Sequence, residues 1–367
     1  MKNIILYGAG ETGKKAVEKY GIDNIAYFCD TNKAGGSIDG IPVIDVATLK
    51  KIHSDYRVIV TPERWNCLGQ ICDTLEQMNI PFEHFANPRH LLHIFGKFPE
   101  LKYECMTDEK DILYFRCVET TKLYKYMFAQ NAEEFKNKEV DIWIYYGDMI
   151  ELAATAADIR NLKHIFCYST SPAYEGFVIP IPDYRSCFDV EQYLYKETQE
   201  LCAESAAKPY EVNKAFWIGT VPTDPGRQAL FRMGQRYPDR LEIFDSSDKE
   251  HPHFVPMLEQ SKYKYLFDLR GLGWSDRTKI LLQLGRPLLY IDRPYAEYFT
   301  KALIPMKHYI PIKEDLSDLF EKMDYVEAHP EVYSDIINNV KKIVEEYLSP
   351  EGIVNYLKEA TLQYGVI

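Results

Sequence analysis

The sequence predicts an α/β protein in which two successive α/β blocks form lobes on either side of a cleft, preceded by a smaller α/β domain. Two observations lead to this prediction. Short apolar strands alternate with amphipathic helices along most of the chain, and a glycine-rich turn joins the first strand to the first helix. Ligands of open parallel sheets bind beyond the carboxyl ends of the strands, so the loops there are the candidate sites.

Composition narrows the class of protein. The chain has 367 residues, and 43 Lys and Arg against 55 Asp and Glu give a formal net charge of −12. Such an acidic chain is not expected to bind nucleic acid through its phosphates. The apolar N-terminal run is too short for a signal peptide, and we expect no transmembrane segment. The eight cysteines lack CxxC or zinc-site spacing, which favours reduced core thiols and a cytoplasmic location.

Residues 1–90 are predicted to form a small Rossmann-like domain, because each of its helices is short. Its expected strands are NIILYG, NIAYFCD, IPVID, RVIVT and PFEHF, and its expected helices are ETGKKAVEKY, VATLKKIH and the run from Glu63 to Met78. Residues 91–108 contain Pro99 and follow no sustained period, which predicts a linker.

Two larger lobes are predicted over residues 109–207 and 208–330. The first has strands in DIWIYYG, HIFCYST and FVIPIP, and the second has strands in AFWIG, LEIFD, YKYLFDL and PLLYID. Helical patterns end the chain, and residues 331–367 are expected to pack back on the first of these lobes.

The first turn carries a GxGxxG motif. Gly8, Gly10 and Gly13 lie between a strand and a helix, and Asp30 ends the next strand. This pattern brings a pyrophosphate close to a helix N-terminus and a carboxylate close to a ribose, so these four residues predict a nucleotide site. It does not identify a dehydrogenase. The stretch FCDTNKAGGSIDGIPVID resembles N-terminal modules of sugar acyltransferases, some of which bind nucleotide-sugars while others have no known ligand.

A second glycine-rich loop follows a strand in YKYLFDLRGLGWSDRTKILLQLG. Ser275 or Asp276 can cap the helix after it, and Arg277 in the first turn could hold a phosphate through two hydrogen bonds. Arg227 also opens a helix after a strand. Two segments in which an arginine opens a helix after a strand and a loop favour a diphosphate site that needs no metal. The alternative for each segment is a capped helix with a solvated arginine.

The segment from Lys262 to Ser317, with the HYIPIKEDLSDL run as its most specific part, resembles glycosyltransferase family 90. The resemblance extends more weakly from about Glu109 through the terminal helices. It implies a two-lobed GT-B-type fold and an inverting glycosyltransferase that uses a UDP-sugar donor and no metal or other cofactor. Inversion in one displacement needs a general base and charge stabilisation of the leaving diphosphate.

The resemblance also implies roles for particular residues. Asp148, at the end of VDIWIYYGD, matches the catalytic base of the family, and the alternative for this residue is a helix N-cap. The predicted donor-binding residues are Gly219, Thr220, Arg227, Gly271, Gly273, Ser275, Arg277, Asp292 and Glu297. The last two are expected to accept hydrogen bonds from the ribose, and the alternative for both is helix capping. Two positions depart from the family pattern, since Ile218 replaces an arginine and Arg270 replaces an aspartate found in many relatives.

The function expected from these observations is sugar transfer to a hydroxyl of a glycan, a lipid-linked glycan or a protein, in bacterial surface polysaccharide or lipopolysaccharide synthesis. Peripheral association with a membrane is compatible with this role. Two alternatives are a NAD-dependent oxidoreductase built on the N-terminal glycine motif and an inactive nucleotide-sugar-binding protein. The sequence identifies neither the sugar and the acceptor nor the oligomeric state.

Overall fold

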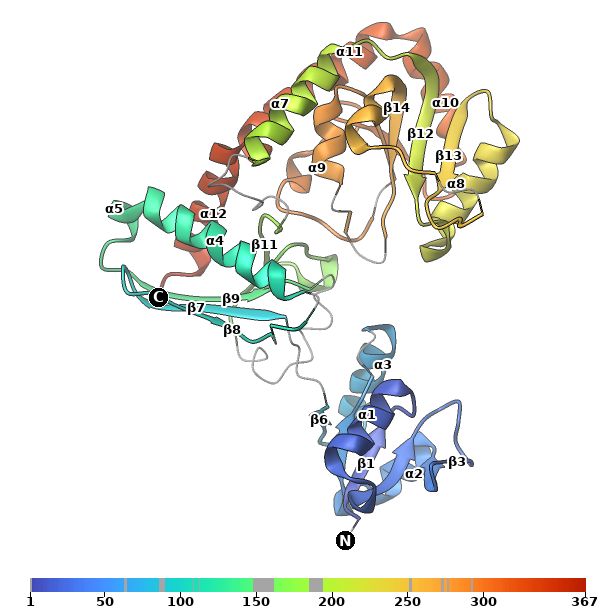
Figure 1. Ribbon diagram of the computed structural model, residues 1–367, viewed down its shortest axis with the longest axis vertical. Coiled ribbons are helices and arrows are strands. Elements are labelled where there is room, and N and C mark those ends of the chain that lie inside the picture. Colours follow the sequence, from blue (N-terminus) through green and yellow to red (C-terminus); the bar gives the residue numbers. More distant parts are fainter. Residues whose placement is uncertain are drawn as a thin grey trace. The chain divides into compact units, whose positions relative to one another are not determined.

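The computed structural model describes residues 2–367 except 63–64, 86–89, 108, 112, 148–161, 185–193, 251–252, 272–273, 276 and 292 (Figure 1). Contacts divide the described chain into two compact units. Met1–His90 belong to the first unit, and Leu91–Asp148 with His164–Ile367 form the second.

The first unit is built on a six-stranded sheet in the order β3-β4-β2-β1-β5-β6, in which every pair except β3 and β4 is parallel. The strands are β1 (Ile4–Tyr7), β2 (Ile25–Cys29), β3 (Ser37–Ile38), β4 (Ile41–Ile44), β5 (Arg57–Val60) and β6 (Glu83–His84). The helices are α1 (Glu11–Tyr20), α2 (Val46–Ile52) and α3 (Trp65–Gln77). All four residues of β1 are buried, as expected of a central parallel strand covered on both faces.

The second unit contains two five-stranded sheets, and we call them the middle sheet and the C-terminal sheet. The middle sheet has the order β11-β10-β9-β7-β8. Its strands are β7 (Leu91–Lys97), β8 (Lys102–Cys105), β9 (Glu139–Tyr145), β10 (Ile165–Cys167) and β11 (Val178–Pro180). Its first helices are α4 (Tyr114–Gln130) and α5 (Ala132–Phe135), and α4 lies across one face of the sheet (Figure 1).

The hairpin of β7 and β8 occupies residues for which the sequence predicted a linker. β7 pairs antiparallel with β9 over its whole length, and Leu91, Leu92 and Ile94 are buried in the core. The strand pattern was missed because alternation in LLHIFGK is short and Gly96 and Pro99 interrupt it.

A disulfide joins Cys105 at the end of β8 to Cys117 in α4, with the two Cα atoms 6.4 Å apart. The prediction that all cysteines are reduced was therefore wrong for this pair. No sequence motif links the two residues, because the hairpin and the helix meet only in the folded chain. Four other described cysteines are free and buried, namely Cys29, Cys72, Cys167 and Cys202.

The C-terminal sheet is fully parallel, with the order β13-β12-β14-β15-β16. Its strands are β12 (Val212–Gly219), β13 (Leu241–Asp245), β14 (Tyr263–Asp268), β15 (Leu288–Ile291) and β16 (Ile310–Ile312). The helices around it are α7 (Leu194–Ala207), α8 (Pro225–Arg236), α9 (Thr278–Leu281), α10 (Leu319–Ala328) and α11 (Pro330–Ile343). Because the strands are parallel, their carboxyl ends share one edge of the sheet.

The last helices of the chain reach both sheets of the second unit. α11 contributes Ile336 and Val340 to the cores of the C-terminal sheet. α12 (Pro350–Tyr364) contributes Ile353 and Leu357 to the core of the middle sheet. The predicted packing of residues 331–367 against the middle sheet thus describes α12, whereas α11 packs elsewhere.

Candidate functional site

A cluster of charged side chains lies at the carboxyl ends of β12, β14 and β15 in the C-terminal sheet. Asp268, the last residue of β14, is completely buried at its centre. Its carboxylate pairs with Arg293 at 2.5 Å and accepts hydrogen bonds from Ser275 at 2.8 Å and Thr278 at 2.5 Å. Burial opposes ionisation of this carboxyl, but the two arginines beside it, Arg293 and Arg277, outweigh burial and hold its pKa below the usual range.

Arg277 and Arg227 flank one indole ring. The guanidinium carbon of Arg277 lies 5.5 Å from the centre of the Trp217 ring, and that of Arg227 lies 5.4 Å from it. Arg277 also donates to the carbonyl oxygen of Ile218 at 2.7 Å. The structure thus brings together two of the residues that the sequence predicted to bind the donor.

The positive charge of Arg227 is less well balanced by nearby groups than that of Arg277. It donates to the carbonyl oxygens of Arg270 and Thr220 and to the hydroxyl of Thr223, all of which are neutral. Burial, followed by repulsion from Arg277, lowers its pKa. Among the described residues its guanidinium pairs with no carboxylate, so an anion such as a diphosphate would be stabilised beside it.

Two glycines lie in the loops that border Arg227 and Arg277. A Cβ atom on Gly219 would lie 2.7 Å from the Trp217 ring, and one on Gly271 would lie 3.4 Å from Arg227. The predicted donor residue Thr220 follows Gly219 and accepts from Arg227 through its carbonyl oxygen. The contact at Gly219 gives a physical reason for a small residue there, whereas the contact at Gly271 is of ordinary length.

Ser275 does not cap the helix, contrary to one of the alternatives from the sequence. α9 begins at Thr278 without a side-chain cap, and the Ser275 hydroxyl bonds to Asp268 instead. A buried carboxylate is the stronger acceptor for this hydroxyl, since hydrogen bonds to charged groups exceed neutral ones. Asp276, the other candidate cap, lies outside the described residues.

The two departures from the family pattern have structural explanations. The Ile218 side chain is buried in the apolar core on one face of the sheet, where a guanidinium would have no obvious partner. Arg270 pairs with Asp224 at 2.9 Å and approaches Glu314 at 3.7 Å. The charge of Arg270 is therefore balanced within the protein.

Glu297, which the sequence predicted to contact the ribose, is buried and only 5% exposed. Burial raises the pKa of its carboxyl to about 8, although the nearby Lys279 favours the charged form. Its role toward a ribose remains a prediction. Asp148, Gly273 and Asp292 lie outside the described residues, so their predicted roles also remain predictions.

The glycine motif of the first unit borders a hollow of about 750 Å³. Gly8, Gly10, Gly13 and Asp30 all line it. The Asp30 carboxylate accepts from the backbone N–H groups of Ala9, Asn32 and Lys33, so it ties the glycine loop to the loop after β2.

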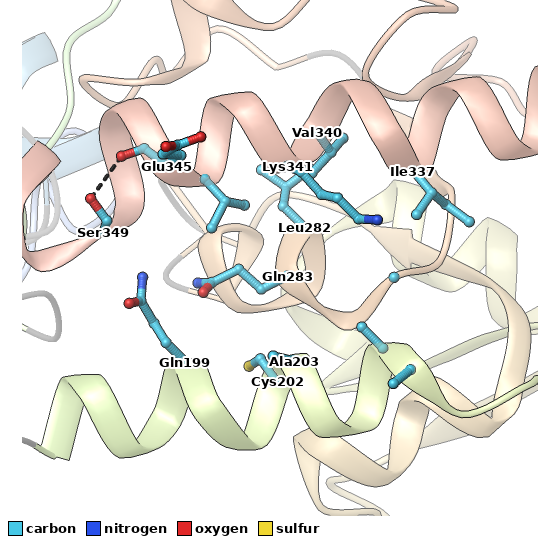
Figure 2. Close-up of a pocket in the computed structure, with 14 residues that line it drawn as sticks. Gln199, Cys202, Ala203, Leu282, Gln283, Ile337, Val340, Lys341, Glu345 and Ser349 are labelled. Atoms are coloured by element: carbon cyan, nitrogen blue, oxygen red, sulfur yellow. Dashed lines mark hydrogen bonds between the residues drawn. The ribbon is translucent and has the colours of Figure 1, made fainter.

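A second hollow, of about 520 Å³, lies in the other unit between α7 and α11 (Figure 2). Its walls are mostly small and aliphatic. Gln199 donates to Leu348 and Gln283 donates to Lys279, so its side-chain amides are partly engaged. None of its described lining residues was predicted to bind the donor, and we do not assign it to the candidate site.

The described residues contain neither a metal-binding cluster nor a membrane-spanning helix. No group of three or more His, Cys, Asp or Glu side chains is placed there to hold a metal ion. Within the same residues, every helix is too short or too polar to cross a bilayer.

The sequence-based prediction did not include three residues of this cluster, namely Trp217, Asp268 and Arg293. Asp268 did carry a signal, because a carboxylate inside the apolar strand YKYLFD is costly unless it is paired. Its partner Arg293 lies 25 residues further on and becomes adjacent only when β14 and β15 pair.

The fold is mixed α/β, and two arginines, Arg227 and Arg277, lie at the carboxyl edge of its fully parallel C-terminal sheet. The sequence profile described as Glycosyl transferase family 90 matches residues 94–366. The chain therefore belongs to glycosyl transferase family 90.

Individual relatives cover less of the chain. Protein O-glucosyltransferase 1 of Rattus norvegicus is 26% identical over 179 residues, which are 46% of this chain and 46% of that protein. Protein O-glucosyltransferase 3 of Homo sapiens is 33% identical over 200 residues, covering 51% of this chain and 39% of that protein. The chain thus spans about half the length of the curated relatives it matches, or less.

Among solved structures, Anabaena HepE in complex with UDP and glucose aligns over 99% of this chain and 100% of its own, with 10% identity and a TM-score of 0.34. A glycosyltransferase from Rickettsia africae aligns over 99% of this chain and 98% of its own, with 9% identity and a TM-score of 0.33. Scores this low do not establish a shared fold.

Proposed function

We propose that this chain is an inverting, metal-independent glycosyltransferase that moves a sugar from a UDP-sugar to an acceptor hydroxyl. The observation that carries the proposal is the pair of guanidinium groups on Trp217. Arg227 and Arg277 converge at the carboxyl edge of a parallel sheet, and Arg227 has no carboxylate partner among the described residues. Such an edge suits the diphosphate of a nucleotide-sugar.

In the proposed mechanism, Asp148 takes the proton of the acceptor hydroxyl as that oxygen bonds to C1 of the sugar. The bond from C1 to the diphosphate breaks, and its electron pair goes to the leaving UDP. Arg227, Arg277 and the amides of the glycine-rich loop stabilise the charge that develops there. Attack on the face opposite the leaving group inverts the anomeric centre.

The expected arrangement is a GT-B-type pair of lobes, with the donor on the C-terminal sheet and the acceptor on the middle sheet. The names of the O-glucosyltransferase relatives make UDP-glucose the first donor to test and a protein hydroxyl one acceptor class. We keep glycans and lipid-linked glycans of bacterial surface polysaccharides as the other acceptor classes.

The test is a calorimetric titration of UDP into the purified chain in the presence of EDTA, repeated on Arg277→Ala. We expect binding without metal and a loss of about tenfold or more in the variant, because charged hydrogen bonds contribute roughly 1.5–3 kcal/mol. Transfer from UDP-glucose is then assayed in the wild type and in Asp148→Asn. Turnover that survives in Asp148→Asn would disprove the proposed base, and UDP binding without any transfer would favour the inactive binding protein.

We also propose that the first unit binds a nucleotide at its glycine motif. The hollow beside Gly8, Gly13 and Asp30 supports this proposal. Titration of NAD tests the oxidoreductase alternative. NAD binding that is unaffected by Arg277→Ala, with no UDP binding, would shift the function to this unit.

A further inference from the structure

Three consecutive residues at the start of α9 are anchored in three different places. Arg277 donates to Ile218 at the end of β12 at 2.7 Å, and Thr278 donates to Asp268 at the end of β14 at 2.5 Å. The next residue is bound outside this sheet. Lys279 donates to Asp183, which follows β11 of the middle sheet, at 2.6 Å.

The Lys279–Asp183 pair is buried, with both residues 2% exposed. Trp274, just before α9, reinforces this contact, because its ring packs in the core of the middle sheet 6.1 Å from Tyr168 and 5.2 Å from the Lys279 ammonium. A buried ion pair adds little net stability compared with an apolar pair of similar volume. We therefore look for its role in the geometry of the two sheets rather than in stability.

Contacts continue from Asp183 toward the end of β9. The neighbouring Tyr184 ring lies 4.6 Å beneath the guanidinium of Arg116, and Arg116 donates to the carbonyl oxygen of Tyr146 at 3.3 Å. Tyr146 stands two positions before Asp148 in the sequence. One chain of packed groups therefore connects the diphosphate-binding edge with the strand that leads to the proposed base.

We propose that the Lys279–Asp183 ion pair is a positioning device that fixes the separation of the proposed base and the diphosphate-binding arginines. The inference rests on the proposed function. Lys279 and Asp183 act through Arg277 and the loop after β11, and neither is assigned a contact with substrate. Misplacement of reacting groups by about 1 Å can lower a rate about 100-fold, so a small shift between the sheets is sufficient.

The test compares Lys279→Met, Asp183→Asn and the double variant Lys279→Met/Asp183→Leu with the wild type. We expect kcat to fall at least about tenfold in all three. The Kd for UDP is expected to stay within about threefold, because the anchors of Arg227 and Arg277 lie inside the C-terminal sheet. The double variant should regain the thermal stability lost by the single variants, since it leaves no unpaired buried charge.

Lys264→Met is the matched control, because it removes an ion pair of the same sheet, Lys264–Glu327 at 2.9 Å, away from the arginine cluster. Its kcat should equal that of the wild type. The proposal is overturned if Lys279→Met keeps its kcat, or if the double variant regains kcat together with stability.

The experiment distinguishes failure of the positioning role from failure of the proposed function. A wild-type chain that neither binds UDP nor transfers sugar overturns both proposals. A wild-type chain that is active, with variants that are equally active, overturns the positioning role alone.

Discussion

At the scale of single residues, the site depends on how buried charges are balanced. Asp268 holds Arg293 and approaches Arg277 at 3.6 Å, and Arg270 is neutralised by Asp224. Arg227 lacks a carboxylate partner among the described residues. This difference distinguishes Arg227, whose charge no described carboxylate balances, from Arg270, whose charge Asp224 already balances.

Arg227→Ala and Arg270→Ala form a matched pair that tests this distinction. We expect Arg227→Ala to weaken UDP binding about tenfold to 100-fold, the equivalent of a charged hydrogen bond of roughly 1.5–3 kcal/mol. Arg270→Ala should change it by less than about threefold, because its charge is already paired. Calorimetric titration of both variants measures the difference, and equal losses would show that the pairing with Asp224 is irrelevant.

We expect the buried carboxyl of Glu297 to make the stability of the folded chain depend on pH. Burial raises its pKa from 4.5 to about 8, while Lys279 and Arg293 oppose the shift and Asp183 and Asp268 add to it. Between these pH values the unfolded chain releases this proton and the native chain retains it, so rising pH favours unfolding. The stability contribution is complete below about pH 4.5 and is lost as pH rises through about 8.

The measurement is thermal unfolding of the wild type and Glu297→Gln at pH 5, 6, 7 and 8. Glutamine does not titrate, so the melting temperature of the variant should rise relative to the wild type as the pH increases. A constant offset at every pH would contradict the assignment of a neutral, buried Glu297.

At the residue scale, the sequence singles out positions that a local motif marks. Arg227 and Arg277 each follow a strand and lie at the start of a helix, and in the structure both lie beside Trp217. The partners of Lys279 and Arg293 were not predictable in the same way. Asp183 is 96 residues from Lys279, and their contact depends on how two sheets pack, which no periodicity encodes.

At the scale of elements, α9 is much shorter than the helix expected from DRTKILLQLG. It covers Thr278–Leu281 and continues as a 3₁₀ turn that ends at Gly285. Gly285 has a left-handed backbone with φ +64°, and a Cβ atom there would lie 2.7 Å from Ala206 of α7. The glycine thus ends the helical segment and allows α7 to approach it closely.

Gly285→Ala is therefore expected to destabilise the chain by more than Gly176→Ala. Both positions have positive φ, but the space around Gly176 is open, so its variant isolates the backbone strain of about 1–2 kcal/mol. The additional collision with α7 should raise the cost for Gly285→Ala by at least about another 1 kcal/mol. Denaturant unfolding gives both values, and equal costs would mean that α7 yields without penalty.

The sequence predicted most strands of the three sheets because parallel strands in β/α alternation are apolar and compact. It failed for β7 and β8, where the pairing is antiparallel and Gly96 and Pro99 interrupt the pattern. It also expected a longer helix after the second glycine loop. There α9 is followed by the 3₁₀ turn Leu282–Leu284, and two residues of α9, Thr278 and Lys279, are held by tertiary contacts.

At the scale of the whole molecule, the family match and the glycine motif concern different parts of the chain. The matched region is 94–366, whereas Met1–His90 form a unit with its own sheet and hollow. All predicted donor residues fall within the matched region. Sugar transfer and any nucleotide binding by the first unit should therefore be separable in the intact chain.

Two substitutions in the glycine motif test this separation. A Cβ atom on Gly13 would collide with the carbonyl oxygen of Gly8 and lie 3.2 Å from Phe28, while one on Gly10 would meet nothing within 4 Å. We expect Gly13→Ala to abolish nucleotide binding by the first unit and Gly10→Ala to perturb it less, because only the former distorts the loop. Both should leave the UDP-dependent kcat within about twofold of the wild type. A selective loss of kcat in Gly13→Ala would mean that the first unit takes part in transfer, since a local distortion of its loop could not otherwise reach Arg227 and Arg277.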